Sequence, residues 1–124
     1  MKAVNEALCR FWSGFGVPAY IEGRVPTDAQ YPYITFGVVS GRFGTMSMLT
    51  ATCWHKAPGA TMAACEMLDD IAGRISDSGL MIPVEDHGYM ILYRCSAFQG
   101  YVQDPSDQDV VGGITNYEMH CFVY

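Results

Sequence analysis

The hydrophobic pattern of this 124-residue chain switches between a helical and a strand period, and this alternation constrains the fold more than any other feature. Near the N-terminus, four apolar residues have helical spacing and predict a first helix: Val4, Leu8, Phe11 and Trp12. After Pro58 and Gly59, four more have the same spacing and predict a second helix: Ala64, Leu68, Ile71 and Ile75. Each helix therefore has one apolar face to bury.

The remaining stretches favour strands, because apolar residues alternate and β-branched or aromatic side chains are common. Two form a predicted long hairpin, residues 31–39 and 46–55, around a turn at 40–44. Two more are expected at 89–102, with a bulge near Gly100, and at 114–124, opened by Gly112-Gly113. Short strands are expected at 20–24 and 80–84, where Pro83 favours a sheet edge.

Helix, strands, helix and strands in this order predict an α+β fold: a mostly antiparallel β-sheet with two α-helices packed on one side. A chain of this length is expected to form a single domain over residues 1–124.

Charged residues make up only 16% of the chain, and half of it is hydrophobic. This composition excludes intrinsic disorder. Thirteen glycines, eight tyrosines and eight methionines take the place of charged residues. Because Tyr and Met are enriched at protein interfaces and Lys and Glu are depleted there, the composition favours a surface partly buried against other subunits. A monomer with a partly apolar surface is the alternative.

The net charge of −6, with the basic residues scattered singly, disfavours tight binding to nucleic acid. No apolar run is long enough to cross a membrane, and no signal peptide is expected at the N-terminus. The five cysteines are an odd number without short spacings, which favours free thiols in a reduced cytosol over a disulfide scaffold or a zinc site.

Residues that could carry chemistry are few. Glu85, Asp86 and His87 are consecutive and precede Gly88, which is typical of a solvated turn. Cys53 with His55, and Glu118 with His120, form pairs two residues apart that need further ligands to hold a metal ion. The glycine pairs lack the strand–loop–helix context of a phosphate-binding loop. We therefore predict no catalytic, metal or cofactor-binding residues.

Three stretches of the sequence resemble the tail-terminator, or tail-completion, proteins of long-tailed bacteriophages and prophages. VPAYIEGRVPTDAQYPYITF (residues 17–36) is similar to their first two strands and the proline-bearing loop between them. Trp54, followed by a helix containing Ala60, Ala64 and Leu68, resembles their strand-to-helix segment. DPSDQDVVGGITNYEMHCF (residues 104–122) resembles their C-terminal turn and closing strand.

This resemblance implies a structural virion protein without enzymatic activity, made in the bacterial host cytoplasm and placed in the neck of the tail. Such proteins form a ring, typically a hexamer, that ends polymerisation of the tail tube and joins the tail to the head connector. The expected partners are thus further copies of this chain, the tail tube protein and the connector protein. DNA is expected to pass through the ring without specific binding, which suits an acidic protein.

Two segments are candidate interfaces. The hairpin turn at 40–44 carries Arg42 and Phe43, residue types that anchor interfaces; a mobile loop tip is the alternative. The segment 103–113 is expected to be a long acidic loop, with Asp104, Asp107 and Asp109, that orders on assembly; a solvated connection is the alternative. A function of a different class remains open: a monomeric enzyme or small-ligand-binding domain that uses Glu85, His87 or His120 in a cleft.

Overall fold

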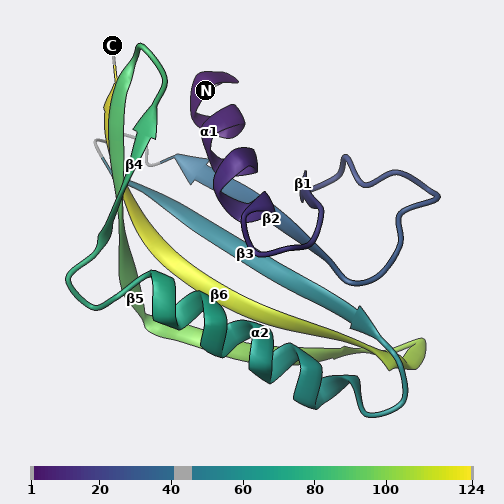
Figure 1. Ribbon diagram of the computed structural model, residues 1–124. Coiled ribbons are helices and arrows are strands. Elements are labelled where there is room, and N and C mark those ends of the chain that lie inside the picture. Colours follow the sequence, from purple (N-terminus) through teal and green to yellow (C-terminus); the bar gives the residue numbers. More distant parts are fainter. Residues whose placement is uncertain (1, 41–45, 124) are drawn as a thin grey trace.

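The computed structural model describes residues 2–40 and 46–123 as a six-stranded sheet with two helices (Figure 1). The strand order in the sheet is β1-β2-β3-β6-β5-β4. The elements, in chain order, are α1 (Lys2–Ser13), β1 (Ala19–Ile21), β2 (Tyr33–Ser40), β3 (Met46–Lys56), α2 (Ala60–Arg74), β4 (Leu80–Val84), β5 (Gly88–Asp104) and β6 (Asp107–Val123).

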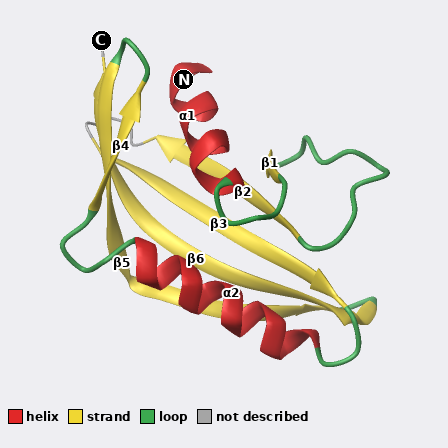
Figure 2. Ribbon diagram, in the orientation of Figure 1, coloured by secondary structure: helices red, strands yellow, loops and turns green. Residues whose placement is uncertain are grey.

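The sheet is mixed. β1 pairs with β2 in parallel, and the other four neighbouring pairs are antiparallel. The predicted α+β class is therefore confirmed, with one parallel pair at the edge of the sheet (Figure 2). β4 pairs only with β5, so Pro83 lies on an edge strand as predicted, where a missing N–H costs no ladder hydrogen bond.

Both helices pack on the same face of the sheet. The Trp12 ring of α1 lies 6.1 Å from the ring of Tyr117 in β6, and a Cβ atom added to Gly113 of the same strand would lie 3.1 Å from Leu68 Cγ of α2. Gly113 and Tyr117 are four positions apart, so they face the same side of the sheet. The predicted apolar faces of the helices are buried there, including Val4, Leu8, Ile71 and Ile75.

Gly113 allows α2 to approach the sheet closely. A Cβ atom at this position would lie 2.8 Å from Cys53 Sγ, in addition to its contact with Leu68. The neighbouring Val111 is buried together with Ala60 and Ala64 of α2. The small residues on both sides thus bring helix and strand together.

Three predicted boundaries are wrong. The first strand is Ala19–Ile21 instead of 20–24. The bulge in β5 is not near Gly100: residues 95–98 have no partner in β6, and the register jumps from Arg94↔Tyr117 to Gln99↔Thr115. Gly112-Gly113 lies inside β6, which begins five residues earlier, at Asp107.

Candidate interaction surfaces

The predicted acidic loop at 103–113 is also wrong, because β5 and β6 continue through it and leave only a tight turn between Asp104 and Asp107. Val110 and Val111, which were expected in that loop, are 5% and 2% exposed. Their burial, partly against α2, outweighs the weak strand propensity of the glycines and aspartates around them. The acidic residues therefore sit at the end of a long hairpin.

We call residues 101–109 the hairpin tip. Asp104 Oδ1 accepts hydrogen bonds from the Ser106 backbone N–H (2.8 Å) and the Ser106 hydroxyl (2.7 Å), and these bonds lower the pKa of Asp104. Asp107 pairs with Lys56 Nζ at 3.3 Å, and Asp109 is exposed. Tyr101 and Val102 are also exposed, at 63% and 42%. The tip thus combines carboxylates with apolar surface.

Arg42 and Phe43, the other candidate interface residues, lie outside the described residues. Ser40 and Met46, which flank this segment in sequence, belong to the paired ends of β2 and β3.

The face of the sheet opposite the helices carries a group of exposed apolar side chains. Six of them project from alternate positions of β2 to β6 at one end of the sheet, and we call them the open-face patch: Val39, Met46, Met48, Met81, Tyr89 and Phe122. Their exposed fractions run from 39% for Tyr89 to 72% for Val39. The Tyr89 and Phe122 rings stack with centroids 5.0 Å apart. Neither α1 nor α2 covers this face.

Of the three residues of the alternative, enzymatic hypothesis, Glu85 and His87 lie together and His120 lies apart from them. Glu85 and His87 line a hollow of about 200 Å³ at the β4–β5 turn, whose surface is mainly polar. His120 lies on the open face, where it meets the Tyr93 ring edge-on and its Nε2 lies 3.8 Å from Glu118. Because α1 borders the hollow and covers the other face, His120 is not part of a site with Glu85 or His87.

Cys53 and His55 do not form an activated nucleophile either. Cys53 is 2% exposed, its Sγ donates to the Gly113 carbonyl at 3.4 Å, and burial raises the pKa of the thiol to about 11. A thiol with such a pKa stays protonated and is a weak nucleophile near neutral pH. Burial also lowers the pKa of His55. Tyr117, whose hydroxyl accepts a 2.6 Å bond from Thr115, has a pKa raised by burial to about 12.

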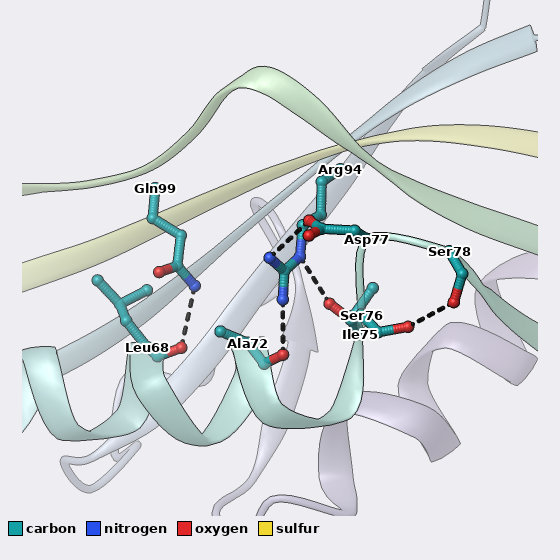
Figure 3. A network of polar contacts seen from close by, with 8 residues as sticks. All are labelled: Leu68, Ala72, Ile75, Ser76, Asp77, Ser78, Arg94 and Gln99. Atoms are coloured by element: carbon teal, nitrogen blue, oxygen red, sulfur yellow. Dashed lines mark hydrogen bonds and ion pairs between the residues drawn. The ribbon is translucent and has the colours of Figure 1, made fainter.

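Arg94 makes the most extensive polar contacts, and it serves the fold (Figure 3). From β5, its Nε and Nη2 atoms each donate at 2.7 Å, to the carbonyl of Ile75 directly after α2 and to that of Ala72 in the last turn of α2. Nη1 pairs with Asp77 at 2.9 Å. Beside it, Gln99 donates to the Leu68 carbonyl at 2.9 Å. The irregular part of β5 is thereby fastened to α2.

Within the chain that the structure describes, no group of three or more His, Cys, Asp or Glu side chains is placed to hold a metal ion. No helix over these same residues is both long and apolar enough to cross a bilayer. Neither a scan against protein-family models nor a search of curated proteins finds a match to this chain.

Proposed function

We propose that this protein is a non-enzymatic subunit of a homo-oligomeric ring that ends the tail tube of a long-tailed phage and joins the tail to the head connector. The observation that carries the proposal is the open-face patch, which the chain does not cover with its own helices. Exposed patches of this kind are typical of protein interaction sites. An extended hairpin and an uncovered sheet face are the parts of this fold that a second subunit can bury. The sequence resemblance supplies the identity of the assembly.

A ring also suits the remaining features. Its subunits meet through two different patches, so no single surface has to be self-complementary. The net charge of −6 opposes capture of DNA on the ring surface, as a channel for passing DNA requires.

Light scattering after size exclusion, over a wide range of protein concentration, tests the proposal together with binding to a purified tail tube protein. We expect a closed oligomer, visible as an annulus by negative-stain microscopy. A strict monomer at high concentration that also fails to bind tail tubes would contradict the proposal.

A matched pair of variants tests the open-face patch. Val39 is 72% exposed in the patch, and Met62 is 69% exposed on α2, away from it. The residue opposite Val39 in β3 is Met48, so a charge at position 39 has an apolar neighbour. We expect Val39→Lys to weaken oligomerisation or tube binding by at least tenfold, because it places a charge in an apolar contact, about 1.4 kcal/mol or more. Met62→Lys introduces the same charge at an equally exposed site and is expected to have no effect. Equal behaviour of the two variants would exclude the patch as the contact.

A further inference from the structure

A groove of about 400 Å³ lies between α1, the C-terminal end of α2 and the edge strand β4. Phe11 and residues 80–83 form its apolar lining, so Met81 of the edge strand borders both this groove and the open-face patch. Arg10 and Arg74 are the charged residues that border the groove. The Arg74 guanidinium is held over the Phe15 ring, 4.4 Å from its centroid. The groove thus offers an apolar floor with two cationic groups at its rim.

These arginines are available for a partner. Among the residues with a described position, neither Arg10 nor Arg74 forms an ion pair. Arg10 also borders the polar hollow next to the groove, which it shares with Glu6, Glu85 and Asp86. Arg74 does not border that hollow and lies one helical turn after Asp70 in α2. The carboxylates of the hollow therefore offset the charge of Arg74 less than that of Arg10.

The hairpin tip has the complementary composition. Its carboxylates include the exposed Asp109 and the Asp104 whose lowered pKa keeps it ionised, and Tyr101 supplies an exposed ring. The β5–β6 turn lies at one end of the sheet, and the elements that border the groove, α1, β4 and the C-terminal end of α2, lie toward the other end (Figure 1). One molecule cannot bring them together, whereas two molecules arranged head to tail can.

We propose that the hairpin tip of one copy docks into the Arg10–Arg74 groove of the next copy. This inference rests on the proposed ring, for which it names one self-contact. The contact is heterologous, because each copy contributes a different patch to each of its two neighbours, and repetition closes a ring when the rotation between copies permits. Opposite charges at its rim select the partner and its orientation.

The acidic hollow fixes the orientation further. Carboxylates of the tip are repelled by Glu85 and Asp86 and attracted by Arg74, so they must approach from the α2 side of the groove. Arg74 is therefore expected to contribute more than Arg10. Tyr101 then faces the apolar floor, and Val102, the next residue of β5, points to the opposite side of the hairpin.

Charge reversal with rescue tests this contact. The groove variant carries Arg10→Glu and Arg74→Glu, and the tip variant carries Asp104→Arg and Asp109→Arg. Each alone is expected to raise the dissociation constant of the oligomer at least tenfold. The chain with all four changes, and an equimolar mixture of the two variants, are expected to regain assembly because the opposite charges meet again.

Arg24→Glu, which changes an exposed arginine outside the groove, is the matched control and is expected to assemble like the wild type. Thermal unfolding of every variant separates loss of contact from loss of fold. A groove or tip variant that proves unfolded is replaced by Arg74→Gln or Asp109→Asn, for which a smaller weakening is expected.

Normal oligomers of the groove variant would overturn this contact and leave the ring itself intact. A wild type that stays monomeric and does not bind tail tubes would overturn the ring as well. Thermal unfolding with decanoate, a small amphiphilic acid, gives a third test. If decanoate stabilised the wild type but not Arg74→Glu, and the groove changes left assembly unaffected, the groove would bind a small acid and not the hairpin tip. That result would also overturn the contact.

Discussion

Replacing Arg94 is expected to detach the end of α2 from the sheet. Arg94→Met removes two charged hydrogen bonds to backbone carbonyls, those of Ala72 and Ile75, and keeps the apolar part of the side chain. A hydrogen bond to a charged group contributes about 1.5–3 kcal/mol. The side chain is 24% exposed, so the solvent replaces part of each bond. We expect a loss of about 2–4 kcal/mol in the free energy of unfolding.

The ion pair between Arg94 and Asp77 should contribute little to the free energy of unfolding, since the Asp77 side chain is 92% exposed. Asp77→Asn is therefore expected to cost less than about 0.5 kcal/mol. Arg94→Lys keeps the charge but loses the planar fork that reaches two carbonyls at once, so its stability should lie between those of the wild type and Arg94→Met.

Urea unfolding followed by far-ultraviolet circular dichroism measures all three variants, with the slope of the transition checked for constancy. Equal losses in the free energy of unfolding for Arg94→Met and Asp77→Asn would show that the exposed ion pair, and not the hydrogen bonds to the carbonyls at the end of α2, stabilises this region. A cost below about 1 kcal/mol for Arg94→Met would refute the reasoning altogether.

Two further predictions concern buried side chains. Leu68→Ala is expected to destabilise the fold by roughly 2–5 kcal/mol, because Leu68 is 6% exposed between α2 and Gly113; an unchanged urea midpoint would contradict its place in the core. His55 has a lowered pKa, so the unfolded chain binds more protons and stability should fall as the pH drops below about 6.5. The stability difference between the wild type and His55→Gln, measured across this range, should shrink toward acid pH; a constant difference would contradict it.

Most helices and strands could be predicted from the sequence, because buried apolar residues recur with the period of the helix or the strand. Val4, Leu8 and Trp12 are buried on α1 as their spacing predicted, and Thr115, Tyr117 and Met119 share the covered face of β6. The helix and the strand each have one apolar side, so the local pattern alone determines which side chains point toward the core.

The end of the long hairpin could not be found in this way. Pro, Gly and Asp are poor strand residues, and the segment 103–113 contains all three. It is a strand because Val110 and Val111 are buried and Gly113 admits Leu68, contacts that depend on where α2 lies. Tertiary packing overrode the local propensity.

The candidate surfaces were harder still to predict, because they join distant parts of the chain. The groove combines Arg10 of α1, Arg74 of α2 and β4. The open-face patch depends on the register that aligns Met48 with Glu118 and Met46 with His120. A hint was present in the sequence. Met46 and Met48 point to one face of their strand and Leu49 points to the other, so the strand is apolar on both faces, which is unusual when one face meets water.

The open-face patch favours one kind of contact in an assembly, and the groove with the hairpin tip favours another. The open-face patch is mainly apolar, with Glu118 and His120 among its neighbours on the same face, so it favours a broad contact whose strength depends on buried area. The groove and the hairpin tip carry opposite charges, so they favour a contact with a defined direction. The proposed ring needs both kinds of contact, since its subunits must associate in a fixed orientation around the ring and also bind the tail tube protein. High salt should therefore weaken the directional contact more than the apolar one.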